Sequence, residues 1–366
     1  MMGEEDIVEP CDNWDLRDLV DRYDYNEEDD SPNPWENFMS DEINEYLIEP
    51  YEYAGIAWLQ REAGIHRIIS EDFFLADLLK QMRDPNNNIA LYRDIRLPKR
   101  DGGHRVISVP HLTLLKVQKA INKNVLKEYL PRHPSAFGFS GGSIDDAIKP
   151  HLKNRVLYSF DVVDAFGQVG AQHLRKNLER YFSVPVSSIL MEIGGPESYD
   201  SGLKQGSAMS PRLFDIAFYQ TDIRIERLAK KLNGTYTRFA DNIFFSLPTN
   251  NFPKKIQSAV LRRMSWVDGC RSRINCHKFS VRRLNKGAVR ILGLNIVNGE
   301  ISATRDYKRN LRLAIHHINY LVDNGFSPYY ADWLRLQGQM SFAELGSLPN
   351  SLLEDYSRLE ERIREM

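Results

Sequence analysis

The feature that most constrains this chain is a pair of acidic residues, each of which lies next to a strongly apolar stretch. Asp161 follows the apolar run 156–160 in RVLYSFDVVDAF, and Asp241 interrupts TYTRFADNIFFS between two stretches rich in aromatic and β-branched residues. Such stretches favour β-strands, and an Asp-Asn pair between two of them favours a hairpin turn. The sequence therefore predicts a hairpin with Asp241 at its tip and a buried strand that ends at Asp161.

Each acid alone has an ordinary explanation, because an Asx turn, a helix cap or a salt bridge would satisfy it. Taken together they suggest more, since two strands distant in sequence can be neighbours in one sheet. Carboxylates that face each other repel unless a cation lies between them. Mg²⁺ prefers a few carboxylate oxygens together with substrate phosphates, and two such ions can hold both oxygens of a phosphoryl transfer. Asp161 and Asp241 are therefore candidate metal ligands for nucleotidyl transfer.

The charge of the chain is strongly divided along its length. Residues 1–53 hold 19 acidic and 2 basic residues, whereas the rest holds 46 basic and 31 acidic residues. A basic body predicts a surface for a polyanion, and an acidic leader can lie against that surface or stay solvated. The leader mixes apolar residues with acids in WDLRDLVDRYDY, a pattern that favours an amphipathic segment docked on a protein surface.

Length and composition limit the class of protein. A chain of 366 residues with 42% hydrophobic residues is long enough for two or three subdomains. The acidic start MMGEEDIVEP predicts no secretory signal, and no apolar run is long enough to predict a membrane span. Three cysteines without paired spacing predict a reducing, cytoplasmic setting and no zinc site.

The pattern along the chain predicts an α+β fold, with a sheet backed by helices. Hairpins are expected at 89–110, around Asp241 and at 289–302, and the first has a basic tip next to Asp101-Gly102-Gly103. Helical patterns are expected at 54–90, 112–130, from Pro211 to 232, at 253–267 and from 307 to the end, and a Gly-Ser turn is expected before Pro211. The strands that carry the two acids thus lie in the middle of the chain.

Seven short blocks, in order, resemble the reverse transcriptases of bacteria, near the retron, group II intron and phage-defence enzymes. The blocks are LPKRDGGHRVISVP, AFGFSGGSIDDAIKPH, FDVVDAF, KQGSAMSP, RFADN, RINCHKFSV and RILGLNIVNG, within residues 89–298. The resemblance implies a right-hand polymerase fold, in which fingers and a palm with an antiparallel sheet backed by helices precede a helical C-terminal thumb. It implies the divisions 1–53 (leader), 54–250 (fingers and palm), 251–305 (end of the palm and primer-grip hairpin) and 306–366 (thumb).

The resemblance also implies roles for residues at the chemical centre. Asp161 and Asp241 would hold two Mg²⁺ ions, or Mn²⁺ in their place, and Asn242 would add a weaker oxygen ligand. Lys278 would lie near the leaving pyrophosphate as a general acid. Asn242 departs from the family pattern, which has a second Asp there, so the metal preference is expected to differ.

Further residues would bind the incoming nucleotide. By resemblance, Lys99 and Arg105 would meet the triphosphate, Gln205 and Gly206 would line the pocket, and Phe166 would lie under the sugar and exclude a 2′-hydroxyl. Charge neutralisation and alignment dominate phosphoryl transfer, which is what these groups supply.

Two further departures from the family pattern concern the binding of a template strand and the branch of the family to which the chain is most similar. Ser140, Gly141 and Gly142 stand in a block where relatives carry arginines, and phosphate contacts by arginine supply much of nucleic-acid affinity. Ile291-Leu292-Gly293 replaces the VTG triplet of retron enzymes, so the likeness is closer to defence-associated enzymes.

The expected function is RNA-directed DNA synthesis from dNTPs in antiviral defence, with a template or non-coding RNA and the DNA product as partners. Alternatives are template-independent or protein-guided synthesis, and a catalytically weak RNA-binding scaffold or activating subunit. A second polymerase or effector subunit, or a second copy of the chain, is a further candidate partner, and no membrane is expected. Glu27 and Glu28 are the candidates for a leader that mimics a template.

Overall fold

A computed structural model describes residues 48–65, 75–83, 91–98, 102–139, 141–196, 201–249, 254–264, 275, 278–326 and 330–365. The chain forms two compact units, each assembled from three stretches of sequence. The first comprises Met1–His133, Asp161–Thr221 and Leu261–Phe279, and the second comprises Pro134–Phe160, Asp222–Val260 and Ser280–Met366. Helices and strands occur in both, so the predicted α+β class is confirmed. No helix among the described residues is long and apolar enough to cross a membrane.

The first unit holds a β-hairpin and a group of helices. Strands β1 (Tyr92–Pro98) and β2 (His104–Pro110) pair antiparallel, with Ile95 opposite Ile107, as the sequence predicted. Among its described residues, the α-helices that lie wholly in this unit are α1 (Ile48–Ala63), α3 (Leu75–Arg83), α4 (Leu112–Ile121), α5 (Lys127–Tyr129), α7 (Ala171–Leu178) and α8 (Val184–Gly194). A π-helical turn over Asn122–Leu126 joins α4 to α5. The helix α9 (Ser210–Lys231) begins in the first unit and ends in the second.

The second unit contains a five-stranded sheet in the order β3-β5-β6-β4-β7. Its central hairpin pairs β5 (Thr235–Phe239) with β6 (Asn242–Leu247), which confirms the hairpin predicted around Asp241. The backbone N–H of Arg155 donates to the carbonyl of Leu247 at 2.8 Å, so β4 (Val156–Asp161) starts beside the end of β6. These two strands therefore run in opposite directions. The outer strands are β3 (Ala136–Phe137), which runs parallel to β5, and β7 (Ser280–Arg283), which runs antiparallel to β4.

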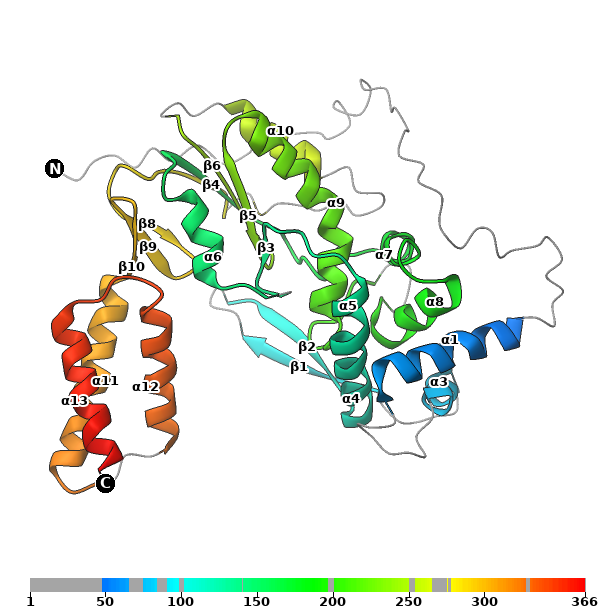
Figure 1. The fold of residues 1–366 in the computed structure, drawn as a ribbon, viewed down its shortest axis with the longest axis horizontal. Coiled ribbons are helices and arrows are strands. Elements are labelled where there is room, and N and C mark those ends of the chain that lie inside the picture. The colour runs from blue at the N-terminus through cyan, green and yellow to red at the C-terminus, as the bar shows by residue number, and fades with distance from the viewer. Residues whose placement is uncertain are drawn as a thin grey trace. The chain divides into compact units, whose positions relative to one another are not determined.

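The C-terminal part of the second unit combines a small sheet with three helices (Figure 1). The sequence predicted one hairpin at 289–302, whereas the structure has three strands, β8 (Val289–Ile291), β9 (Leu294–Val297) and β10 (Glu300–Ala303). The helices α11 (Arg305–Asp323), α12 (Tyr330–Ala343) and α13 (Asn350–Arg364) lie side by side. The remaining helices of this unit are α6 (Ile144–Ile148), a 3₁₀ turn over Lys149–His151, and α10 (Lys254–Met264), which extends past Val260.

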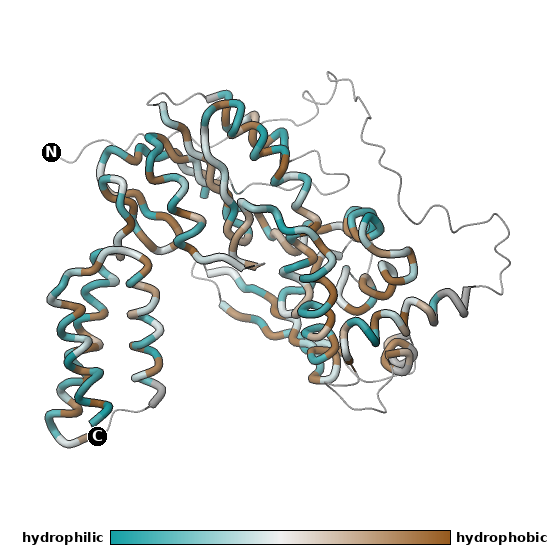
Figure 2. The backbone as a smooth tube through the Cα atoms, in the orientation of Figure 1, coloured by the Kyte–Doolittle hydropathy of each residue, from teal (hydrophilic) through white to brown (hydrophobic). Residues whose placement is uncertain are grey.

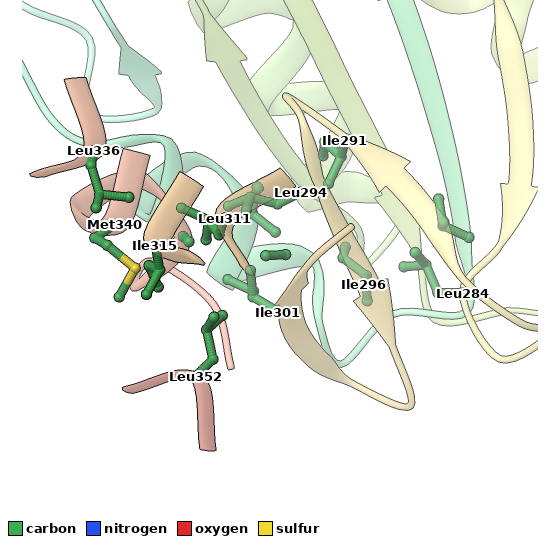
Figure 3. Close-up of a cluster of buried hydrophobic side chains, with 14 of the residues drawn as sticks. Leu284, Ile291, Leu294, Ile296, Ile301, Leu311, Ile315, Leu336, Met340 and Leu352 are labelled. Carbon is green, nitrogen blue, oxygen red and sulfur yellow. The ribbon is translucent and has the colours of Figure 1, made fainter. Parts of the chain in front are cut away.

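One apolar core joins the small sheet to the three helices. Leu294 and Ile301 of the sheet pack with Leu311 and Ile315 of α11, and all four side chains are buried (Figure 3). Hydropathy along α11 and α13 is mixed, as expected for helices that bury one face (Figure 2). Removing this apolar surface from water stabilises the small sheet, whose strands of three and four residues are too short to be stable alone.

A buried polar cluster lies beside the central hairpin of the five-stranded sheet. The ring nitrogens of His151 hydrogen-bond the hydroxyl oxygens of Ser246 and Thr237 at 2.6 and 2.7 Å. Asn154 also donates to the Ser246 hydroxyl, at 2.6 Å. Burial lowers the pKa of His151 to about 3, because a charged imidazole would lose its hydration there. The folded chain therefore holds this ring neutral near neutral pH.

Acid is expected to destabilise the chain through His151. The unfolded ring binds a proton near pH 6.5 and the folded ring does not, so the contribution of this residue is complete above pH 6.5 and is lost as the pH falls toward 3. Between pH 7 and 5 the free energy of unfolding should fall by about 2 kcal/mol more in the wild type than in His151→Gln. Urea titrations at the two pH values measure this difference, and equal pH dependence in both proteins would contradict it.

Candidate active site

Asp161 is the last residue of β4 and lies where that strand leaves the sheet. The Nζ atom of Lys278 donates to its two carboxylate oxygens at 3.2 and 3.1 Å. The Asp161 side chain is 16% exposed and that of Lys278 is 60% exposed. The backbone carbonyl of Asp161 accepts from the N–H of Asn275 at 2.8 Å, which ties the segment of Lys278 to the strand end. The structure thus brings together two residues predicted for the chemical centre.

Asp241 lies in the two-residue turn between β5 and β6, as the sequence predicted. Ala240 has a backbone φ of 55°, in the left-handed region that a tight turn requires. The amide nitrogen of Asn242 donates to the carboxylate of Asp241 at 3.0 Å. Asn242 therefore orients this carboxylate through its nitrogen, while its amide oxygen is a further acceptor for a cation. Both side chains are half-buried.

The oxygen donors fit a divalent cation of the Mg²⁺ type. Strand β4, which ends at Asp161, is the neighbour of β6, which begins directly after Asp241. Carboxylate and amide oxygens are ligands that Mg²⁺ accepts, and this ion usually completes its shell with water and substrate phosphates. Within the described part of the chain, no group of three or more His, Cys, Asp or Glu residues could hold a metal ion. An ion held by two carboxylates and an amide would have coordination positions left for water and substrate phosphates.

The predicted nucleotide-pocket residues Gln205 and Gly206 lie against strand β2. The backbone N–H of Ser108 donates to the carbonyl of Gln205 at 2.7 Å. Gly206 has a φ of 128°, and a Cβ atom at this position would lie 2.3 Å from the carbonyl oxygen of Ser108. Arg105 is on the same strand, three residues before Ser108, and its side chain is exposed. The structure therefore brings Gln205 and Gly206 together with the strand that carries Arg105.

A buried glutamine holds this region in place and was missed by the sequence interpretation. The Gln118 side chain on α4 is fully buried and donates to the Tyr92 hydroxyl at 2.6 Å and to the Ile193 carbonyl at 2.9 Å. Its amide oxygen accepts from the backbone N–H of Ala208 at 3.2 Å. The Lys204 ammonium lies 4.4 Å from the centre of the Tyr92 ring. The one indication in the sequence was that Gln118 is a polar residue on the apolar face of the helix predicted over 112–130.

Phe166 lies in the turn that follows β4 and is half-buried. Its ring centre is 5.5 Å from that of Phe214 on α9, and the Phe214 ring stacks on Phe218 one turn further along. The Phe166 carbonyl accepts from the N–H of Leu203, two residues before Gln205, at 2.8 Å. These contacts hold the ring against α9 and tie the backbone of Phe166 to the segment that leads to Gln205.

Three predicted site residues lie outside the described residues: Lys99, Glu27 and Glu28.

Known proteins resemble this chain in both structure and sequence. A telomerase from Candida albicans in complex with a fragment of telomeric RNA aligns with 78% of this chain and 61% of its own, at a TM-score of 0.44 and 11% identity. A foamy viral protease–reverse transcriptase in complex with double-stranded DNA aligns with 79% of this chain and 46% of its own, at a TM-score of 0.38 and 18% identity.

Sequence relatives include the reverse transcriptases of bacterial retrons. The Mx65 enzyme of Myxococcus xanthus is 28% identical over 63% of this chain and 57% of its own length, and the Mx162 enzyme is 32% identical over 60% and 51%. The Ec73 enzyme of Escherichia coli is 26% identical over 68% and 81%. The chain thus spans between half and three fifths of the first two relatives. These relatives are retron enzymes, although residues 291–293 depart from the expected retron triplet.

The family model for the reverse transcriptases, or RNA-dependent DNA polymerases, matches residues 97–296, which include Asp161, Asp241 and Lys278. This match covers more than half of the chain and bears out the resemblance of the seven sequence blocks. The chain belongs to the reverse transcriptase family and has its α+β polymerase fold.

Proposed function

We propose that this chain is an RNA-directed DNA polymerase that joins dNTPs with the help of two Mg²⁺ ions. The observation that carries the proposal is the position of the two acids, one at the end of β4 and the other directly before the neighbouring strand β6. In a member of the reverse transcriptase family, this is where metal-binding carboxylates are needed. Asp161 and Asp241 would supply the negative charge, and Asn242 an amide oxygen.

The other residues of the site would bind and align the reactants. Lys99 and Arg105 would neutralise the triphosphate, while Gln205 and Gly206 would line the nucleotide pocket. The divalent ions, when bound, would neutralise charge on the phosphates and lower the pKa of the attacking 3′-hydroxyl. Alignment by the protein would provide most of the remaining acceleration.

Lys278 is proposed as the proton donor to the leaving pyrophosphate. Its ammonium lies 3.1 Å from the Asp161 carboxylate, which keeps a proton donor beside a proposed metal ligand. A cation on that carboxylate would compete with the ammonium, which is exposed and long enough to turn toward a phosphate oxygen. The proton would move from Nζ to the oxygen that leaves the α-phosphorus atom.

Phe166→Ala is expected to admit ribonucleotides. A smaller side chain removes the ring beneath the sugar, so a 2′-hydroxyl no longer collides with it, and the preference for dNTPs over rNTPs should fall about 100-fold. Competition between dCTP and rCTP in primer extension measures the preference. Phe218→Ala is the control: it removes the ring that stacks on Phe214 and leaves Phe166 in place, so the preference for dNTPs should stay as in the wild type. An unchanged preference in Phe166→Ala would rule out the gate.

Asn242→Asp is expected to leave the fold intact and tighten Mg²⁺ binding. The change restores the family's second carboxylate and removes the hydrogen bond to Asp241, so two neighbouring acids would repel each other until a cation binds. The Mg²⁺ concentration for half-maximal rate should fall several-fold, with an equal or higher maximal rate. Metal titration of primer extension measures both. Complete loss of synthesis would instead give Asn242 a specific role of its own.

The proposed setting is bacterial antiviral defence, in the cytoplasm. The retron relatives and the sequence likeness to defence-associated enzymes support this setting. The proposed division of the chain is a leader over 1–53, fingers and palm over 54–250, the end of the palm over 251–305 and a thumb over 306–366. Proposed partners are a template or non-coding RNA, the DNA product and a second polymerase, effector or copy of the chain.

The test is to incubate nuclease-treated protein with Mg²⁺, dNTPs and a primed RNA of defined sequence, and to sequence the DNA. The proposal expects DNA complementary to the added RNA. A defined product without added RNA that changes in Glu27→Ala or Glu28→Ala would favour protein-guided synthesis. No synthesis with Mg²⁺ or Mn²⁺ would favour the scaffold or activating-subunit alternative.

A further inference from the structure

Beside the hairpin that carries Asp241 lies a fully buried pair of opposite charges. Arg238 on β5 and Asp222 on α9 both have 0% side-chain exposure. The guanidinium meets the carboxylate with two hydrogen bonds, from Nε to Oδ1 at 2.9 Å and from Nη2 to Oδ2 at 2.8 Å. The Tyr236 hydroxyl also donates to Oδ1. The carboxylate therefore accepts from three donors at a position without solvent exposure.

The remaining nitrogen of the guanidinium reaches the turn that precedes Asp241. Nη1 of Arg238 donates to the backbone carbonyl of Ala240 at 2.8 Å. The N–H of Ala240 donates to the carbonyl of Phe137 on β3 at 3.0 Å. Both backbone polar groups of Ala240 are thus held, and Ala240 has the left-handed φ of 55°. The backbone enters Asp241 in a direction that these two hydrogen bonds fix.

Stability alone does not explain this arrangement. Burying two charges costs much of what their attraction returns, and apolar residues of similar size are often as stable. A guanidinium has five N–H groups in a rigid plane, so it can grip a carboxylate and a carbonyl at once, whereas an ammonium cannot. Burial raises the pKa of Tyr236 well above its usual value, and the Asp222 carboxylate adds to this effect, so the phenol stays a donor.

We propose that Arg238, held by Asp222, is a positioning residue that sets the direction of the Asp241 carboxylate. The inference rests on the proposed role of Asp241 as a metal ligand, and it adds to the site two residues that touch neither metal nor substrate. Rotation of the turn by a small amount would move Asp241 away from its ion, and misplacement of about 1 Å can cost about 100-fold in rate.

The test replaces the whole polar cluster by apolar residues, in the triple variant Asp222→Leu, Tyr236→Phe, Arg238→Met. No buried charge is left unpaired, so the fold is expected to persist, while the hydrogen bond to Ala240 is lost. The expected result is about a 10-fold rise in the Mg²⁺ concentration for half-maximal rate and about a 100-fold fall in kcat, with the KM for dNTP changed less than about 2-fold.

Two single variants control for other effects. Tyr236→Phe keeps the hydrogen bond from Arg238 to Ala240 and should keep the Mg²⁺ dependence of the wild type. Arg238→Lys keeps a charge beside Asp222 but loses the hydrogen bond to the Ala240 carbonyl. It should therefore raise the Mg²⁺ concentration for half-maximal rate, as the triple variant does. This second variant decides the question if the triple variant does not fold.

A readout without catalysis separates this inference from the proposed function. Hydrogen exchange of the amides at 240–242 should be about 10-fold faster in the triple variant and in Arg238→Lys, with exchange elsewhere in the sheet unchanged. If the wild type makes no DNA, the proposed function fails while exchange still reports on the positioning. Folded variants with wild-type exchange at 240–242 and wild-type Mg²⁺ dependence would overturn the inference and leave the pair a structural one.

Discussion

Asp161→Asn and Asp241→Asn should each lower the rate of dNTP incorporation by about 1,000-fold or more. Loss of one carboxylate ligand leaves part of the positive charge of the cation without a neutralising partner. A rate that is about 1,000-fold lower corresponds to a loss of about 4 kcal/mol of transition-state stabilisation. The amide keeps the size of the side chain and much of its hydrogen bonding. The fold should therefore persist in both variants.

Asp161→Asn also weakens the contact with Lys278, but that effect on stability should be small. The ammonium is 60% exposed, and such pairs contribute about 1 kcal/mol or less. Single-turnover primer extension on an RNA template, with urea titration of each variant, separates chemistry from folding. Asp306→Asn, an exposed change at the start of α11, is the matched control and should keep the wild-type rate. A loss below about 10-fold in either site variant would contradict the metal assignment.

Gly206→Ala is expected to lower kcat/KM for dNTPs by about 100-fold. The new Cβ would lie 2.3 Å from the Ser108 carbonyl oxygen, a backbone atom that cannot rotate away, and a φ of 128° is outside the usual range of alanine. The loop must therefore move from β2 and carry Gln205 with it. A displacement of about 1 Å in such a site accounts for a factor of this size.

Gly287→Ala is the matched control for this prediction. Gly287 lies in the turn between β7 and β8 with a φ of 80°, and a Cβ atom there meets nothing within 4 Å. The control introduces a strained backbone without a collision, so it should lower the free energy of unfolding by about 1–2 kcal/mol and leave the KM for dNTP unchanged. Steady-state kinetics at varied dNTP measure both proteins. Equal kinetics in Gly206→Ala and Gly287→Ala would show that the contact with β2 does not shape the pocket.

The local sequence predicted the hairpin around Asp241 and the strand that ends at Asp161, because their residue types favour these conformations without outside help. It also predicted the β1–β2 hairpin, whose turn contains Gly102 with a φ of 85°. It predicted one hairpin over 289–302 but missed the turn that divides this segment into three strands, where Leu292 and Gly293 have φ values of 49° and 88°. Packing against α11 stabilises the third strand, β10, and so does the hydrogen bond from the Ser347 N–H to the Ile301 carbonyl.

Contacts between distant residues were beyond a single sequence. Gln118 interacts with Ala208 across 90 residues, and Lys278 contacts Asp161 across 117. The local sequence around either residue does not indicate its partner, because these contacts depend on how distant elements pack in the fold. The resemblance to the family predicted a chemical role for Lys278, whereas no motif marked Gln118.

Asn242 and Arg238 show the same limit on a smaller scale. The sequence marked Asn242 as a departure from the family and predicted a weak ligand, but its hydrogen bond to Asp241 depends on the conformation of the turn, which the sequence does not specify. Arg238 is the first residue of the RFADN block, just before the turn. Its burial against Asp222 was not predictable, because charged residues in strands are usually exposed.

Iron cleavage tests most directly the proposal that Asp161 and Asp241 hold the same metal ions. With Fe²⁺ in place of Mg²⁺, ascorbate and peroxide generate hydroxyl radicals that cut the backbone near a bound ion. The account predicts two sets of fragments from the wild type, one near residue 161 and one near residue 241, both suppressed by excess Mg²⁺ and both absent in Asp241→Asn. Cleavage at only one position, or at both positions in Asp241→Asn, would contradict it.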